Sequence, residues 1–160
     1  MTAVTILTLP AQQNGGPIDV PAGARAVLQA KGDGVQIYTC SDEHGGAKWI
    51  LKAPDAKLLD ASGKVIGSHF AGPTWKLEDG SRVQGELISS QPAPDADSVP
   101  WLLLRAKTGS ATGALAGVAF IRRTETHGGL ATKSGCESSR DVGNTVQIPY
   151  TATYTFYATR

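Results

Sequence analysis

The chain has 160 residues and a mass of 16.6 kDa, the size of one domain with a single hydrophobic core. Its composition, 41% hydrophobic and 18% charged, excludes a disordered chain, and its formal net charge of +1 excludes the basic character that binding to a phosphate backbone requires. We therefore expect no nucleic-acid partner, and we expect no membrane span because no apolar run approaches the ~18 residues that would cross a bilayer.

Short apolar runs separated by Gly, Pro, Asn, Asp and Ser recur along the whole chain, whereas helical periodicity is almost absent. This pattern predicts strands at residues 24–29, 35–40, 48–53, 57–60, 65–70, 74–77, 82–87, 101–107, 115–124 and 146–157. Glycine-containing turns at 60–63 and 78–81 are typical of antiparallel hairpins. We predict an all-β fold, a single antiparallel β-sandwich or barrel-like domain over residues 1–160, with long Gly/Pro-rich loops at 89–99 and 128–144.

The clearest predicted strand is the last one. Apolar side chains occupy every second position from Val146 to Phe156, and most positions between them are threonine. This alternation is typical of a strand with one face on a core and the other near water. Pro149 lies within the strand, and because proline donates no backbone hydrogen bond it predicts an edge position or a bulge.

Three histidines, His44, His69 and His127, are candidate metal ligands. Together they could form a site resembling zinc or copper centres, and a smaller alternative uses His69 and His127 alone. No two of them have ligand-type spacing, so the competing interpretation places His69 in a rigid turn with a hydrogen bond and His44 in an exposed loop. With an ordinary pKa near 6.5, His69 could also act as a general base.

Tryptophans provide the second candidate site. The simplest interpretation is that they fill a β core, but Trp75 and Trp101 lie beside polar turns and could stack on a sugar or another flat ligand. Acidic and hydroxyl groups of the nearby turn would then supply hydrogen bonds. The sequence predicts a ligand site from His69, Trp75, Asp79, Ser81 and Trp101.

Catalytic motifs are missing from the sequence. It has no GxSxG element and no cysteine in a catalytic context with histidine. Ser68 and His69 are adjacent, and adjacent strand residues point to opposite faces, so they make a poor nucleophile and base. Arg122 and Arg123 are interpreted as ordinary charges at a strand end. We expect a non-catalytic protein with no cofactor, apart from the zinc or copper alternative.

Several motifs together resemble a known family. They are Gly34-Val-Gln-Ile-Tyr-Thr-Cys40, His69-Phe-Ala-Gly-Pro-Thr-Trp75, Asp79-Gly-Ser81, Pro100-Trp-Leu-Leu-Leu104, Ile121-Arg122, Thr126-His-Gly-Gly129, Cys136 and Tyr150-Thr-Ala-Thr-Tyr-Thr-Phe-Tyr157. From about residue 34 to 157, the chain resembles the domain of unknown function 3455 family (DUF3455). Members of that family are mostly small exported bacterial and fungal proteins. The resemblance therefore implies a secreted or periplasmic setting, and the family name implies no activity.

Cys40 and Cys136 are the only cysteines. The residues alone leave two alternatives, a pair of inert thiols or a disulfide. The exported setting implied by the resemblance favours the disulfide.

Residues 1–10 lack the basic region and cleavage site of a signal peptide, which predicts a chain that is cytosolic or already processed. The resemblance favours the processed alternative.

The function we predict is that of a non-catalytic module binding a carbohydrate or another small molecule. Two alternatives remain open from the sequence. One is a zinc- or copper-binding protein, with or without redox activity, and the other is a structural or interaction protein of the envelope or cell wall with no small ligand. Neither the ligand nor the oligomeric state follows from the residues.

Overall fold

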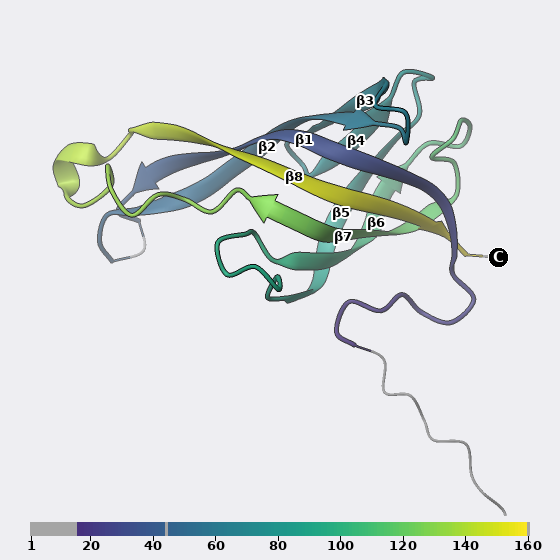
Figure 1. Ribbon diagram of the computed structural model, residues 1–160, viewed down its shortest axis with the longest axis horizontal. Coiled ribbons are helices and arrows are strands. Elements are labelled where there is room, and N and C mark those ends of the chain that lie inside the picture. The colour runs from purple at the N-terminus through teal and green to yellow at the C-terminus, as the bar shows by residue number, and fades with distance from the viewer. Residues whose placement is uncertain (1–15, 44, 160) are drawn as a thin grey trace, which may run out of the picture.

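The computed structural model describes residues 16–43 and 45–159, so residues 1–10 and His44, both considered above, lie outside it. Eight antiparallel strands form one sheet in chain order, and β8 pairs with β1 to close the sheet in a ring (Figure 1). This confirms the prediction of an all-β, antiparallel, barrel-like fold. The strands are β1 (Arg25–Ser41), β2 (Lys48–Leu59), β3 (Val65–Phe70), β4 (Thr74–Leu77), β5 (Arg82–Gln91), β6 (Trp101–Gly109), β7 (Val118–Gly128) and β8 (Thr145–Ala158).

The first strand is continuous where the sequence predicts two. Residues 24–29 and 35–40 both belong to β1, and the glycines between them are sites of close packing rather than a turn. A Cβ on Gly34 would lie 2.1 Å from the Asp55 carbonyl oxygen, and a Cβ on Gly32 would lie 2.6 Å from the Tyr154 ring. Glycine is thus required because neighbouring groups occupy the space of a side chain.

The second strand was also predicted in two pieces, 48–53 and 57–60, and is continuous from Lys48 to Leu59. Pro54 lies in its middle and is opposite Gln36 of β1, beside a register shift between Ile37 and Tyr38. Such an irregularity lets a strand contain a residue that donates no backbone hydrogen bond.

The hairpin strands β3 and β4 have the predicted bounds, whereas β5 continues into the predicted loop at 89–99. Its extension pairs with the start of β6, where Gln91 is opposite Trp101. The following loop packs closely on β7, because the Thr126 hydroxyl donates to the Val99 carbonyl oxygen at 2.6 Å.

The last strand confirms the predicted alternation in its middle, where Tyr150, Ala152 and Tyr154 are buried and the threonines between them are partly exposed. Towards its end Thr155 and Tyr157 are buried as well, so both faces are covered there. Pro149 pairs only with β1, since the pairing with β7 ends at Tyr150. The predicted edge position is therefore confirmed.

A disulfide joins Cys40 at the end of β1 to Cys136, which lies 96 residues later in the 128–144 loop, as predicted. The Cα atoms are 5.5 Å apart. The same loop contains one turn of 3-10 helix, η1 (Ser139–Asp141). Within the described residues no helix is long and apolar enough to cross a membrane.

The core occupies the interior of the ring and consists mainly of aliphatic and aromatic side chains. It comprises Ala30, Ala56, Leu58, Trp75, Leu77, Val83, Val99, Leu104, Leu115, Val118, Ile121, Tyr150, Ala152, Tyr154 and Phe156. Polar side chains are buried beside this core, among them Gln36, His69 and Arg123. Buried polar groups need partners, so their surroundings are the first place to look for a functional site.

Candidate functional site

A cavity of about 340 Å³ lies among these buried polar side chains. Residues of β1, β2, β6, β7 and β8 and of the β3–β4 hairpin contribute to its wall. They are Gln36, Leu51, Lys52, Ala53, Pro54, His69, Ala71, Gly72, Pro73, Trp75, Leu102, Leu104, Arg123 and Tyr154. We call this space the interior cavity. The volume is within the range of sites that hold small organic ligands.

His69 and Trp75 meet in the wall of the interior cavity because they are directly opposite each other on β3 and β4. Their rings are stacked, with centroids 4.4 Å apart and an interplanar angle of 12°. Nδ1 of His69 lies 2.8 Å from the Thr74 carbonyl oxygen. A carbonyl only accepts, so Nδ1 carries the hydrogen and the neutral ring has its lone pair on Nε2.

Burial lowers the pKa of His69 to about 4, and the positive charge of Arg123 acts in the same direction, against the hydrogen bond to Thr74. The ring is therefore neutral at pH 7. A neutral imidazole presents an acceptor at Nε2 and carries no positive charge into the cavity.

Arg123 corrects a prediction, because it is not an ordinary charge at a strand end. Its side chain is 7% exposed, and Nε and Nη2 donate to the Pro100 carbonyl oxygen at 3.1 and 2.7 Å. Arg122, the next residue, places its guanidinium over the Tyr157 ring, 5.4 Å from the centroid. The single ion pair found among residues 16–43 and 45–159 joins Arg105 to Glu86, so Arg123 has no carboxylate partner there.

The positive charge of Arg123 affects the pKa values of the polar groups around it. Burial raises the pKa values of the Tyr154 and Tyr150 hydroxyls, and the nearby guanidinium opposes that rise in both. The two hydroxyls lie 2.9 Å apart and hydrogen-bond each other. Beside the apolar core, the interior of the ring thus contains a polar cluster with one fixed positive charge.

Two polar atoms in the wall of the interior cavity lack a hydrogen-bond partner within the described part of the chain. They are Oε1 of Gln36 and Nε1 of Trp75, and both side chains are only 1% exposed. Leaving a buried polar group unpaired costs about 1–3 kcal/mol, so such atoms are rare in folded proteins and mark places where water or a ligand binds.

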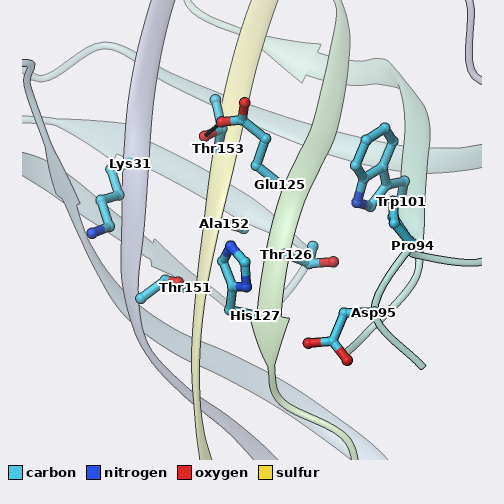
Figure 2. A pocket seen from close by; sticks show the side chains of 10 residues that line it. All are labelled: Lys31, Pro94, Asp95, Trp101, Glu125, Thr126, His127, Thr151, Ala152 and Thr153. Atoms are coloured by element: carbon cyan, nitrogen blue, oxygen red, sulfur yellow. Dashed lines mark hydrogen bonds between the residues drawn. The ribbon is translucent and has the colours of Figure 1, made fainter. Parts of the chain in front are cut away.

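A second hollow of about 540 Å³ lies on the outside of the ring, and we call it the outer groove (Figure 2). Its lining residues are Lys31, Pro94, Asp95, Trp101, Glu125, Thr126, His127, Thr151, Ala152 and Thr153. Glu125 has φ of 50° at a break in the β7–β8 register, and its carboxylate accepts a 2.7 Å hydrogen bond from the Thr153 hydroxyl. The outer groove is larger than the interior cavity, and its charged side chains and His127 are exposed to water. Nε1 of Trp101 is also buried without a hydrogen-bond partner among the described residues.

The five predicted ligand-binding residues do not form one site. His69 and Trp75 line the interior cavity, whereas Trp101 lines the outer groove. Asp79 and Ser81 lie in the β4–β5 turn, where Asp79 accepts hydrogen bonds from the Ser81 amide and hydroxyl and from the Ala114 amide. These bonds lower the pKa of Asp79, and they fasten the turn to the β6–β7 connection.

The histidines considered as metal ligands are also separated. His69 lines the interior cavity and His127 lines the outer groove, while His44 lies outside the described residues. No group of three or more His, Cys, Asp or Glu side chains that could hold a metal ion occurs in the portion the structure describes.

Sequence reasoning missed Gln36, Arg123 and Tyr154 as site residues. Each lies on the inward face of its strand, and the two-residue period could have placed them there. Arg123 is two residues from the buried Ile121, and Gln36 is two residues from the buried Tyr38. A polar residue two positions from an apolar residue of the same strand lies on the same face, and this spacing could have indicated that Gln36 and Arg123 face inward.

The sequence of residues 21–158 matches the family described as Protein of unknown function (DUF3455). The chain belongs to this family. The match covers nearly all of it and confirms the resemblance seen in the motifs, which began at about residue 34. No curated protein and no solved structure gives a significant match. The DUF3455 description contains no activity, so the interior cavity and the outer groove are the features that bear on function.

Proposed function

We propose that this DUF3455 protein is a binding module without catalytic chemistry, and that it holds a small molecule in the interior cavity. The observation that carries the proposal is the pair of buried, unpartnered polar atoms, Oε1 of Gln36 and Nε1 of Trp75, in the wall of one cavity. A ligand that donates to the first and accepts from the second would remove both penalties at once.

The composition of the wall supports the same function. Apolar side chains such as Leu102 and Leu104 alternate with a few buried polar groups, which is the usual make-up of small-molecule sites. His69 is neutral and stacked on Trp75, so it is suited to hydrogen bonding and packing rather than to proton transfer at pH 7.

A cavity-filling variant tests the proposal. Ala53 is half-buried in the wall, and Ala53→Phe would occupy part of the 340 Å³. We expect small organic molecules that bind the wild-type protein in ligand-observed NMR to lose at least about tenfold in affinity. Ala111→Phe, the same change at an exposed position in the β6–β7 connection, is the matched control and should bind as wild type does.

Two outcomes would contradict the interior cavity as the binding site. Equal affinity of the Ala53→Phe and wild-type proteins for every binder would place binding elsewhere. A broad fragment library with no binder of the wild-type protein at millimolar concentration would favour a structural or interaction role, which capture of partners from the native envelope would then examine.

Carbohydrate binding is the second candidate, and the outer groove favours it. Trp101 lies at one side of the groove, and the side chains of Thr151, Thr153 and Lys31 extend along the other (Figure 2). An indole face beside hydroxyl and charged groups suits the apolar and polar faces of a sugar ring. Glycan-array binding that is lost in Trp101→Ala and kept in Ala53→Phe would support it, and the reverse pattern would exclude it.

We also infer that the protein functions in an oxidising compartment. The Cys40–Cys136 disulfide supports this, because such bonds persist mainly in secreted, periplasmic and cell-surface proteins. Fractionation of the native cells checks it, and recovery of the protein in the cytosol with both thiols reduced would contradict it.

A further inference from the structure

We propose that the ligand of the interior cavity is a small organic carboxylate, whose anionic group binds Arg123 and whose apolar body lies against the aliphatic part of the wall. The inference rests on the proposed function and adds the chemical class of the ligand. Three features of the interior cavity support it, namely the hydrogen bonds of one guanidinium, the charges in the wall and the apolar side chains of the wall.

Arg123 has unused donors. A guanidinium has five N–H groups, and two of them, one on Nε and one on Nη2, donate to the Pro100 carbonyl oxygen. The Tyr154 hydroxyl is a further hydrogen-bond partner of the guanidinium, which leaves at least two N–H groups on Nη1 and Nη2 for a ligand. The N–H groups of Nη1 and Nη2 that point away from the side chain lie parallel, and they form the fork that the two oxygens of a carboxylate match.

The charge of Arg123 is also unbalanced. Its side chain is 93% buried, yet its hydrogen-bond partners, the Pro100 carbonyl oxygen and the Tyr154 hydroxyl, are neutral groups, and burying an unpaired charge is costly. The lining residues include a second cation, the exposed Lys52, and no aspartate or glutamate. In the outer groove, by contrast, Asp95 and Glu125 accompany Lys31. The interior cavity is thus the hollow whose charge fits an anion.

The rest of the wall predicts what the carboxylate is attached to. Leu51, Pro73, Leu102 and Leu104 are apolar, and Leu51 is half exposed at the cavity. An apolar body placed there would be removed from water together with these side chains. Phenylacetate, an aromatic ring with one carboxylate, is therefore a suitable probe, and phenylacetamide is its neutral counterpart of nearly the same shape.

The experiment is a titration of the whole protein, labelled with nitrogen-15, with each probe at pH 7. The three indole N–H signals belong to Trp49, Trp75 and Trp101, and only Trp75 lines the interior cavity, so its signal reports binding there. We expect phenylacetate to bind at least about tenfold more tightly than phenylacetamide, because a hydrogen bond to a charged group is stronger than one to a neutral group. Arg123→Gln should abolish this preference, and Arg122→Gln, which changes the neighbouring arginine over the Tyr157 ring, should keep it.

The outcomes separate this inference from the proposed function. If both probes shift the Trp75 signal with affinities within twofold, the cavity binds ligands but the anion inference is wrong. Preference for the carboxylate that survives in Arg123→Gln would also overturn it. No shift of the Trp75 signal by either probe at a concentration of about 10 mM would overturn the inference, while binders from the fragment library would still uphold the cavity as a binding site. The comparison of phenylacetate with phenylacetamide in the wild-type protein tests the preference for an anion even if a variant fails to fold.

Discussion

His69 shows how one residue can be important without being a catalyst. Its ring is buried, is stacked on Trp75 and lies 4.9 Å from the Tyr154 ring centroid. The groups that set its charge state are the Thr74 carbonyl oxygen, the Arg123 guanidinium and the apolar surroundings. A site that takes up a proton only near pH 4 acts as a fixed neutral hydrogen-bonding group under ordinary conditions.

The lowered pKa predicts a pH-dependent stability. Between about pH 6.5 and pH 4 the unfolded chain binds a proton at His69 and the folded chain does not, so the free energy of unfolding falls as the pH falls through this window. Over the whole window, the lowered pKa of His69 reduces the free energy of unfolding by about 3 kcal/mol. Urea unfolding from pH 7 to pH 4 should show this loss in the wild-type protein relative to His69→Gln, in which the contribution of all other groups is retained. Parallel pH dependence of the two proteins would show that His69 titrates normally.

The strands show where sequence patterns succeed and where they fail. The β3–β4 hairpin was predicted to the residue, because its ends coincide with turn-forming residues and its pattern is local. The breaks predicted within β1 and β2 were wrong, because Gly34 and Pro54 act through a neighbouring strand that no local pattern reveals. The candidate site shows the same division. His69 and Trp75, which the sequence suggested, line the interior cavity, whereas Arg123, whose environment depends on Pro100 and the ring interior, was interpreted as an ordinary charge at a strand end.

Packing at Gly34 can be tested directly. Gly34→Ala would bring a methyl group within 2.1 Å of the Asp55 carbonyl oxygen and 2.5 Å of the Ala56 Cα, so β1 and β2 must move apart. We expect a loss of about 2 kcal/mol or more in the free energy of unfolding. Gly109→Ala in β6, where the closest heavy atom would be 3.9 Å away, is the control and should be close to neutral. Similar denaturation midpoints for the two variants would contradict the assigned role of Gly34.

At the scale of the whole molecule, the ring is fastened at two places, by the β1–β8 pairing and by the disulfide. Cys40 ends the long strand β1, and Cys136 belongs to the loop that leads into β8. Backbone hydrogen bonds strengthen this junction, because the Cys40 amide donates to the Asn144 carbonyl oxygen and the Gly143 amide donates to the Cys40 carbonyl oxygen. The disulfide therefore reinforces contacts that the backbone already makes.

Removing the disulfide should still be costly, because it closes a 96-residue separation in the unfolded chain. In the chain-entropy treatment such a loop contributes about 4.7 kcal/mol. We expect the double variant Cys40→Ala with Cys136→Ala to lose stability of that order in urea unfolding, with the cysteine-free fold retained by circular dichroism. A change below about 1 kcal/mol would mean that residual structure already restricts the unfolded chain without the disulfide.

The pairing of the first strand with the last also determines the order in which the molecule can form. Residues 25–39 of β1 find their partners between 145 and 158, so the ring remains open until the final strand is available. Each hairpin from β2 to β7 can assemble beforehand, but β1 and β7 both present unpaired edges during that interval. We therefore expect slow folding in which the ring closes last, and we expect a nascent chain that stalls before β8 to self-associate through its two unpaired strand edges.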